Sequence, residues 1–492
     1  MKSLLRAIWL LLMLGLSSLA PGAEGVQPYW PQAQSLFPEA QDLGPLEGTP
    51  PSAPVLGANG VLGYVVLTND VLRIPGYSGK PINVLVGMDT QGTIRGIRVV
   101  QHQEPILLVG FTEKDLRNFT DQYAGKKVTD QVRVGGRPAP GQPVIDAMTG
   151  ATITVMVINR VVNEAVRKVA LARGLINKHT GGLQPLNSEP IWRETWRSRG
   201  VDIAVLAVGL LVLVLILLFQ DSLARHPTLL TRLRRAYLLY TVFFIGLYGM
   251  AQLSIVNVLT FVQSLLRDFK WESFLIDPMM FLLWSFVAVV LLLWGRGVYC
   301  GWLCPFGALQ ELLFQLAQRL RIPQWDPPQV VHERLWAIKY IVLIALFGLS
   351  LQSMGEAERY AEIEPFKTVF SLHLMRDAGF VVYALALLAV GLFIRKAYCR
   401  YLCPLGAALT FPGRFRIFDW LRRRRECGRP CQICARECEV QAIRPTGEII
   451  DNECHYCLDC QVTYWNRHVC PPLVEKHRKR ALRERLSSDG EH

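Results

Sequence analysis

The sequence predicts a multidomain membrane protein with three parts: an exported small α/β domain, an α-helical transmembrane bundle and a cytoplasmic, cysteine-rich α+β domain. Three observations support this fold class. The 492-residue chain is 51% hydrophobic yet 19% charged, and the two kinds of residue fall in separate regions. The chain begins like an export signal and later carries several long apolar runs. Its twelve cysteines all lie from Cys300 onward. A single soluble domain would not show this segregation.

Residues 1–23 have the three-part layout of a secretory signal peptide. Lys2 and Arg6 precede the apolar run AIWLLLMLGL, and small residues ending in APGA follow it. The apolar run is short for a bilayer span, so we expect cleavage after Ala23 rather than an uncleaved anchor helix, which is the alternative. In either case the next residues are exported. They divide into a Pro- and Gly-rich segment, a folded domain and a linker, at 24–56, 57–180 and 181–200.

The bundle is predicted over residues 201–425. About five stretches there are apolar and long enough to cross a hydrocarbon layer of about 30 Å: 201–220, 237–260, 278–295, 335–352 and 379–394. The loop 221–236 carries four arginines, whereas the loop 354–378 is acidic. Because Lys and Arg favour the cytoplasmic side, this pattern predicts a multi-pass protein of the cell inner membrane, with a periplasmic N-terminal domain and a cytoplasmic C-terminus.

The formal net charge of +13 is explained by this topology and by attraction to anionic lipid. We therefore expect the lipid bilayer, and no nucleic acid, as a partner. The arginine run 422–425 would be the alternative nucleic-acid patch, and residues 473–492 form a basic tail.

Eight cysteines near the C-terminus, within 426–472, form two runs. A four-iron cube takes four cysteines, and in two-cluster ferredoxins three come from one run and the fourth from the other. The region resembles a bacterial-type ferredoxin domain, although its spacing departs in the first run and before the last cysteine. The sequence thus predicts two [4Fe–4S] clusters, and a pair of zinc sites is the alternative. The predicted ligands are Cys427, Cys431, Cys434 and Cys470 for one cluster, and Cys454, Cys457, Cys460 and Cys438 for the second.

A second informative stretch runs from Asp146 to Ala170 in the exported domain. Apolar residues recur there at helical spacing after Thr152, so Thr149, Gly150, Ala151 and Thr152 stand at a helix start. Free backbone N–H groups and the helix dipole at such a start attract phosphate. An ordinary Thr-capped helix is the alternative.

These residues resemble the flavinylation motif of the FMN-binding domains in Rnf, Nqr and NosR-type proteins. The resemblance implies that Thr152 is esterified to the FMN phosphate, with Asp146, Thr149, Gly150 and Ala151 completing the motif. Upstream, His102-Gln103-Glu104-Pro105-Ile106 resembles the HxEPI stretch of the NosR/NirI family, which implies flavin contacts for His102 and Glu104. Otherwise these two would be surface residues at a strand end. Strand-like runs before them fit a small α/β domain.

The order of the parts resembles the NosR/NirI family along nearly the whole chain, and the half from residue 201 also resembles NapH-type membrane ferredoxins. The family resemblance implies an electron-transfer protein in denitrification, acting between quinol or cytoplasmic donors and a periplasmic reductase system of the nitrous oxide reductase type. A membrane-bound regulatory or maturation factor for a periplasmic metalloenzyme is the alternative. The linker before the first span is shorter than in typical NosR proteins, which weakens the nitrous oxide reductase partnership.

A ten-residue motif occurs twice, as YCGWLCPFGA from Tyr299 and YCRYLCPLGA from Tyr398. Each copy follows an apolar run and an arginine, so both are predicted at the inner mouth of the bundle. Four thiolates suffice for a shared metal site or for two dithiol switches, and close packing of small residues is the structural alternative. These thiols belong to Cys300, Cys304, Cys399 and Cys403.

Electrons that pass between an outer flavin and inner clusters need a relay across the hydrocarbon layer. A b-type haem would need axial histidines, but none of the nine histidines falls in a predicted span, and His226, His332 and His373 are predicted in loops. We therefore expect a quinone near the bundle, on grounds of the family resemblance alone. The predicted activity is that of an electron carrier, with quinol dehydrogenase-like chemistry as an extension.

Overall fold

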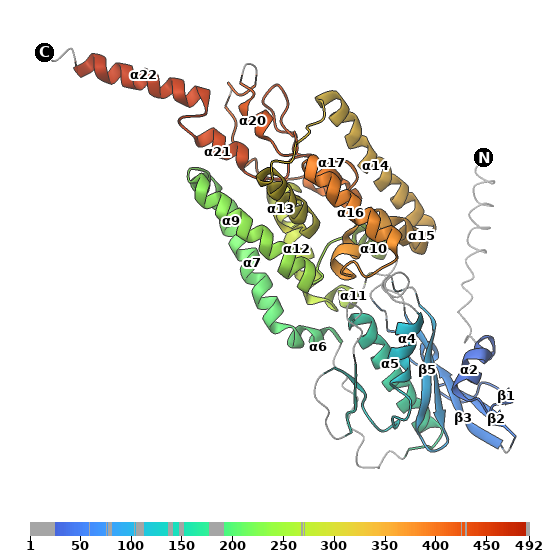
Figure 1. The fold of residues 1–492 in the computed structure, drawn as a ribbon. Helices are drawn as coiled ribbons and strands as arrows, with labels where there is room; N and C mark the ends of the chain where they lie inside the picture. The colour runs from blue at the N-terminus through green and yellow to red at the C-terminus, as the bar shows by residue number, and fades with distance from the viewer. Residues whose placement is uncertain are drawn as a thin grey trace, which may run out of the picture. The chain divides into compact units, whose positions relative to one another are not determined.

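In the computed structural model the chain forms two compact units, residues 1–188 and 189–492 (Figure 1). The structure describes residues 25–488 apart from gaps at 59, 75, 77–80, 103, 105–112, 136–140, 147–151, 177–190, 267–268, 270, 425 and 429–430. The predicted signal peptide and the first half of the predicted linker 181–200 lie outside the described residues.

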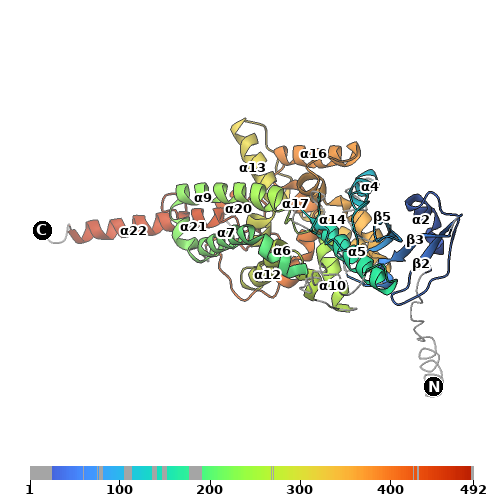
Figure 2. The same ribbon diagram turned by 90° about the horizontal axis from the view of Figure 1, so that it is seen from below.

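The first unit contains a five-stranded antiparallel sheet in which each strand pairs with the next one along the chain. Every residue of β4 up to Met88 is buried, because α2 and α5 both pack on this strand from opposite sides of the sheet (Figures 1 and 2). The α/β class predicted for this part is therefore observed. The strands are β1 (Asp42–Leu43), β2 (Ala53–Gly57), β3 (Gly60–Leu67), β4 (Asn83–Asp89) and β5 (Ile94–Gln101), and the two main helices are α2 (Trp30–Leu36) and α5 (Thr152–Ala172).

The predicted start of this domain at residue 57 is wrong. The segment 24–56 supplies α2, β1 and β2, and β2 pairs with β3 along its length. Ala53 and Val55 alternate into the core, so the short apolar positions between prolines and glycines are enough for an edge hairpin. Further elements are the 3₁₀ turns η1 (Gln27–Tyr29) and η2 (Thr68–Asp70), α4 (Glu113–Asp121), and a parallel pair of β6 (Arg133–Val134) with β7 (Val144–Ile145).

The second unit opens with α6 (Ile191–Ser198), α7 (Gly200–Leu218), α8 (Gln220–Ala224) and α9 (Pro227–Tyr240), and α9 continues as the π-helix η3 (Thr241–Tyr248). The rest of the bundle comprises α10 (Ile255–Leu266), α11 (Trp271–Leu275), α12 (Pro278–Leu293), η4 (Tyr299–Leu303), α13 (Pro305–Arg319), α14 (Gln329–Gln352), α15 (Met354–Tyr360), η5 (Ala361–Ile363), η6 (Lys367–Ser371), α16 (Ala378–Phe393), α17 (Ala397–Tyr401), α18 (Pro404–Ala408) and α19 (Thr410–Gly413).

Two of these helices, α7 and α14, are long and apolar enough to cross a membrane, and α10, α12 and α16 are apolar but shorter. The predicted span 237–260 is not one helix. Its first part belongs to the run from Pro227 to Tyr248, and a non-helical segment with a positive φ at Met250 separates it from α10. That φ value falls outside the helical region of the backbone map, so the helix cannot continue through this position.

The C-terminal part of the second unit contains α20 (Ile433–Glu437), α21 (Asp459–Trp465) and α22 (Pro471–Ser488), joined by loops that carry most of the cysteines. Ile443 and Ile449 form an antiparallel bridge around the turn at Gly447, the one β-feature that the described residues show between the two cysteine runs. The predicted basic tail is helical over most of its length, as α22 (Figure 1).

Candidate functional site

The start of α5 and the strand that precedes it come together in the first unit. Thr152 is the first residue of α5, whereas Thr149, Gly150 and Ala151 lie outside the described residues. Glu104 is fully buried and accepts a hydrogen bond of 2.8 Å from the hydroxyl of Thr154. Glu104 is therefore no surface residue: it holds the first turn of α5, two positions from Thr152.

Two further predicted residues are His102, which lies beside Glu104, and Asp146, which precedes α5 along the chain. His102 is half-buried, and burial lowers its pKa, although the charge of Glu104 acts in the opposite direction. The backbone N–H of Asp146 donates to the side chain of Gln122 at 2.7 Å, which fixes the chain just before the motif. A buried carboxylate and a half-buried imidazole therefore lie close to the first turn of α5.

The C-terminal cysteines fall into two spatial groups. Burial raises the pKa of Cys454 to about 12, and the nearby Cys438 charge adds to this rise. Cys438 acts on Cys457 and Cys460 in the same way, so it lies with the later run. In the first group, Arg424 donates to Cys470 Sγ at 2.8 Å and its backbone N–H donates to Cys427 Sγ at 3.4 Å.

These contacts join Cys470 to the early run, and Cys427 and Cys431 form a backbone bridge within it. Arg423 interacts with Cys460 of the later run as well as with Cys434 and Cys427, and Cys434 Sγ donates to the Cys460 carbonyl at 3.9 Å, so the two groups are in contact. Within the part of the chain that the structure describes, no three cysteine, histidine or carboxylate side chains converge on one metal ion. A cube bridges thiolates that stand further apart than the ligands of a single ion. Cysteine thiols are the ligands that a four-iron cube takes.

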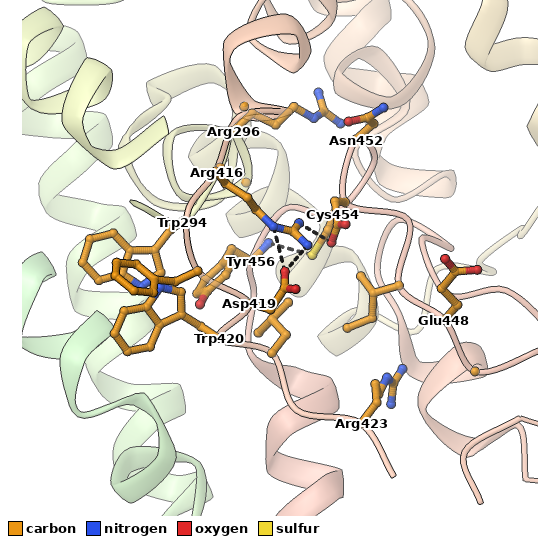
Figure 3. A pocket seen from close by; sticks show the side chains of 18 of the residues that line it. Trp294, Arg296, Arg416, Asp419, Trp420, Arg423, Glu448, Asn452, Cys454 and Tyr456 are labelled. Carbon is orange, nitrogen blue, oxygen red and sulfur yellow. Dashed lines mark hydrogen bonds and ion pairs between the residues drawn. The ribbon is translucent and has the colours of Figure 1, made fainter. Parts of the chain in front are cut away.

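A cavity of about 580 Å³ has one cysteine of each group, Cys427 and Cys454, in its wall (Figure 3). Trp294 and Trp420 stack at one side of it with ring centroids 5.3 Å apart. Arg416 pairs with Asp419 and Asp451 inside the same wall. The cavity therefore combines an aromatic surface with charged groups beside both sets of cysteines.

The two CxxxCP copies share a helix cap, although the first copy contains the π-helix η4 and the second contains the α-helix α17. Cys304 precedes α13 and its sulfur accepts from the Gly307 N–H at 3.4 Å, while Cys403 precedes α18 and accepts from Gly406 at 3.2 Å. Proline follows each of these cysteines at the first helical position, where no backbone donor is needed. The four thiols of Cys300, Cys304, Cys399 and Cys403 lie within electrostatic range of one another.

The loop of the second cysteine group packs directly on the first CxxxCP copy. The indole N–H of Trp302 donates to the Tyr456 carbonyl at 2.9 Å. A Cβ on Gly301 would overlap the His455 carbonyl oxygen, and one on Gly297 would come within 2.7 Å of the Cys454 carbonyl oxygen. Glycine is needed at both positions because the two backbones touch.

Buried ion pairs stabilise the same interface, and the sequence did not predict them. Glu453 binds Arg296 at 3.5 Å and Lys339 of α14 at 2.5 Å. Glu311 binds Arg234 at 2.7 Å and Lys396 at 2.8 Å. Isolated charged residues in or beside apolar runs were the available signal, since such residues are rare in bundles unless they pair.

The prediction that His332 lies in a loop is wrong. It lies in α14 rather than in a loop, it is fully buried, and its Nδ1 stands 2.9 Å from the Tyr401 hydroxyl. The predicted apolar span begins at residue 335, whereas the helix begins at Gln329, because a paired polar residue can extend a buried helix past its apolar segment.

Comparison with known families matches three parts of the chain. Residues 76–167 match a model described as FMN-binding domain. Residues 276–323 and 378–426, which contain one CxxxCP copy each, match a 4Fe-4S binding domain. Residues 425–481, which hold the eight C-terminal cysteines, match the NosR model.

Relatives extend over almost the full chain. The regulatory protein NosR of Pseudomonas aeruginosa is 36% identical over 686 positions, covering 96% of each chain, and that of Stutzerimonas stutzeri is 35% identical over 693 positions, covering 98% of this chain and 95% of its own. The protein NirI of Paracoccus denitrificans is 52% identical over 292 residues, covering 59% of this chain and 43% of its own. Because the NosR alignments are longer than this 492-residue chain, NosR carries residues that are missing here.

Proposed function

Because the chain belongs to the family of the regulatory protein NosR, we propose that it is a membrane protein that moves single electrons between a quinol or cytoplasmic donor and an exported acceptor. The FMN-binding and 4Fe–4S domains support an electron-transfer or regulatory role. The finer proposal concerns the route, which would join the C-terminal clusters, the CxxxCP motifs and the flavin.

The observation that carries this proposal is the docking of the second cysteine group on the first CxxxCP copy. Trp302 and Gly301 touch the backbone of Tyr456 and His455, within two residues of Cys454 and Cys457. The cysteines proposed to ligate this cluster would therefore be separated from the first CxxxCP copy by one backbone contact and a short stretch of chain. Such short paths favour electron transfer, whereas a purely structural contact would not require cysteine on both sides.

The residues present fit both kinds of cofactor. Thr152 at the start of α5 would hold the FMN phosphate, with Asp146 and the segment 149–151 before it, while Glu104 and His102 would support the same end of the domain. FMN supplies the exchange between two-electron and one-electron carriers when bound, and each cluster carries one electron. The chain itself would orient these groups and exclude water from them.

The proposed setting is the cell inner membrane, with the FMN domain periplasmic and the cysteine groups cytoplasmic. The apolar helices α7, α10, α12, α14 and α16, together with the run from Pro227 to Tyr248, would supply the spans. The proposed exported partner is a reductase of the nitrous oxide reductase type or one of its maturation proteins, and the proposed source of electrons is a quinol. The cavity of about 580 Å³ beside both cysteine groups is large enough for a quinone ring.

Covalent flavin attachment tests the outer half of the route. Denatured wild-type protein on a gel should fluoresce under ultraviolet light, and Thr152→Ala should abolish the fluorescence. Thr120→Ala, a change in the same domain far along the chain from the motif, should leave it unchanged. Fluorescence that survives Thr152→Ala would place the attachment at another residue.

Metal analysis tests the inner half. Anaerobically purified protein should contain about eight iron atoms in the two C-terminal clusters, with matching acid-labile sulfide. Replacing Cys454 or Cys457 by alanine should remove about half of this iron. Zinc in place of iron and sulfide would refute the ferredoxin assignment.

A regulatory or maturation factor is the second candidate, and the word "regulatory" in the printed names of its relatives favours it. In that case the redox groups would report their state to a partner that assembles a periplasmic metalloenzyme. Reduced quinol should reduce the flavin in membranes if the protein is a carrier. A protein that stays oxidised with quinol, yet still supports assembly of an active periplasmic enzyme, would favour the factor.

A further inference from the structure

We propose that Arg424 raises the reduction potential of the first C-terminal cluster above that of the second, so that the first cluster is reduced first. The first cluster is the one assigned to Cys427, Cys431, Cys434 and Cys470, and the second is the one assigned to Cys454, Cys457, Cys460 and Cys438. This inference rests on the proposed function, because it concerns the clusters that these cysteines would hold. It gives the arginine run 422–425 a role beyond membrane topology.

The backbone of the arginine run is held against α21 at Arg422. The buried side chain of Gln461 accepts from the Arg422 N–H at 3.1 Å and donates to the Arg422 carbonyl at 3.2 Å. The Arg422 side chain pairs with Asp221 of α8 at 3.0 Å. Because the chain is fixed on both sides of this residue, the two arginines that follow start from a defined position.

Arg424 contacts two cysteines of the first cluster. Its side chain donates to Cys470 Sγ at 2.8 Å, and its backbone N–H donates to Cys427 Sγ at 3.4 Å. The Cys427 N–H in turn donates to the Arg424 carbonyl at 3.1 Å, which closes a short turn. Cys470 is 94% buried, so the charge of the guanidinium acts on its sulfur with little screening by water.

The ring of Tyr464 holds the guanidinium of Arg424 in this position. The guanidinium carbon lies 3.9 Å from the ring centroid, which is a cation–π contact. Tyr464 belongs to α21, the same helix that binds Arg422 through Gln461. One helix therefore positions both the backbone of the run and the side chain that reaches Cys470.

A positively charged donor beside a cysteine sulfur favours the reduced form of a cluster. A cluster gains one negative charge when it accepts an electron, and its reduction potential depends on the net charge and on the hydrogen bonds to its sulfurs. Hydrogen bonds from an ionised donor are stronger than those from a neutral donor. Arg424 would therefore stabilise the reduced first cluster more than the oxidised one, which raises the potential.

Three sulfurs of the second cluster accept hydrogen bonds from neutral donors. The donors are the Tyr456 N–H, the Ala442 N–H and the Gln461 side-chain amide, which lie 3.4 Å, 3.3 Å and 3.5 Å from the sulfurs of Cys454, Cys438 and Cys460, respectively. These bonds also favour reduction, but each does so less strongly than a bond from a guanidinium. The donors alone thus predict the higher potential for the first cluster.

Two carboxylates beside the second cluster add to this difference. Glu439 and Asp459 each neighbour a cysteine of the second cluster in the sequence, and both interact electrostatically with Cys457. Arg234 offsets part of this negative charge, since it pairs with Glu439 at 3.5 Å. Negative charge beside a cluster opposes the addition of an electron, so the carboxylates lower the potential of the second cluster.

Arg423, the other arginine beside the cysteines, does not distinguish the two clusters. It lies in the wall of the cavity (Figure 3) and interacts with both Cys434 of the first cluster and Cys460 of the second. At Cys434 its charge opposes that of Glu437. Arg424 is therefore the arginine whose contacts separate the two clusters.

The donor of the proposed function supplies the electrons. A quinol that becomes a quinone releases two protons and two electrons, one electron for each cluster, and no covalent bond to the protein forms or breaks. The first electron goes to the first cluster because its potential is the higher. The guanidinium of Arg424 is charged in both states, so this residue exchanges no proton.

Redox titration of the full-length, anaerobically purified protein, followed by electron paramagnetic resonance, tests the proposal. Cys454→Ala, which should lack the second cluster, assigns the signals. Arg424→Gln should reduce the preference of the first cluster for its reduced form about tenfold, which is a midpoint potential lower by about 59 mV for one electron, and leave the second cluster unchanged. Arg424→Lys keeps the charge and should restore more than half of the shift. Arg422→Gln, which loses the pair with Asp221 in the same run, is the matched control and should move neither potential.

The outcomes separate this inference from the proposed function. An unchanged first potential in Arg424→Gln, or equal shifts of both clusters, refutes the role of Arg424 while the two clusters still stand. A wild-type protein whose first cluster has the lower potential also refutes it. Zinc in place of iron and sulfide overturns the proposed function and this inference together.

A second variant covers the case in which Arg424→Gln does not assemble the first cluster. Tyr464→Leu removes the ring that positions the guanidinium and leaves the arginine and all the cysteines in place. It should lower the potential of the first cluster by a smaller amount than Arg424→Gln. An unchanged potential in Tyr464→Leu then refutes the proposal.

Discussion

The two CxxxCP copies share their helix caps and differ in what packs on them. In the first copy Gly301 directly follows the first cysteine, and the His455 backbone packs against it. In the second copy the equivalent residue is Arg400, whose guanidinium reaches the Gln441 side chain at 2.7 Å. Both copies therefore contact the C-terminal domain, the first through its backbone and the second through a long side chain.

The arginines that precede the first cysteine of each copy also differ in burial and in their contacts. Arg296 is 98% buried and binds both the Gly406 carbonyl, at 2.8 Å, and Glu453. Arg395, its counterpart, is half-buried and lies over the Phe314 ring at 4.9 Å. The first copy therefore binds the C-terminal domain tightly and the second leaves more of its surface to the bundle.

The largest expected effect comes from replacing the arginine that precedes the first copy. Arg296→Ala removes a buried charge from a pair with Glu453 and should lower the free energy of unfolding by about 3 to 5 kcal/mol. Arg395→Ala removes a half-exposed cation–π contact and should cost less than about 1 kcal/mol. Thermal unfolding in detergent, followed by release of iron, measures both. Equal losses would show that the two copies are not used differently.

The next effect tests the backbone contact. Gly301→Ala forces a methyl group against the His455 carbonyl, and since backbone cannot rotate away we expect a loss of about 1 to 3 kcal/mol together with slower electron exchange between the clusters. Gly348→Ala in α14 has open space around its Cα and should be neutral or slightly stabilising. A harmless Gly301→Ala would contradict the direct docking.

The smallest effect concerns the side-chain contact of the second copy. Arg400→Lys keeps the charge but cannot reach both Gln441 and His332, which the guanidinium contacts at 2.7 Å and 2.9 Å. We expect a loss of about 1 to 1.5 kcal/mol. Arg444→Lys changes an exposed pair with Glu448 and should stay within about 0.5 kcal/mol. If the two variants behave alike, the Arg400 contacts contribute no stability and the second copy does not dock.

The sequence by itself determined the modules of this protein. Cysteine runs, the repeated CxxxCP motif and the Asp146 to Thr152 stretch are local patterns, so the family, the FMN-binding domain and the 4Fe–4S domains could be predicted before any coordinates. Helical spacing after Thr152 likewise predicted α5, because periodicity is a property of neighbouring residues. The extent of the sheet was missed, since the pairing of β2 with β3 depends on a hairpin between weakly apolar strands.

Only the tertiary structure decided how these modules meet. The pairing of Glu453 with Lys339 joins residues 114 positions apart, and no local pattern marks either of them as a partner. The same is true of Glu104 with Thr154, and of His332 with Tyr401. Long-range contacts of this kind depend on the shape of the folded chain, because burial makes an unpaired charge or polar atom costly only where the fold removes water. The contact between Gly301 and the His455 backbone was decided in the same way, by packing between segments far apart in the sequence.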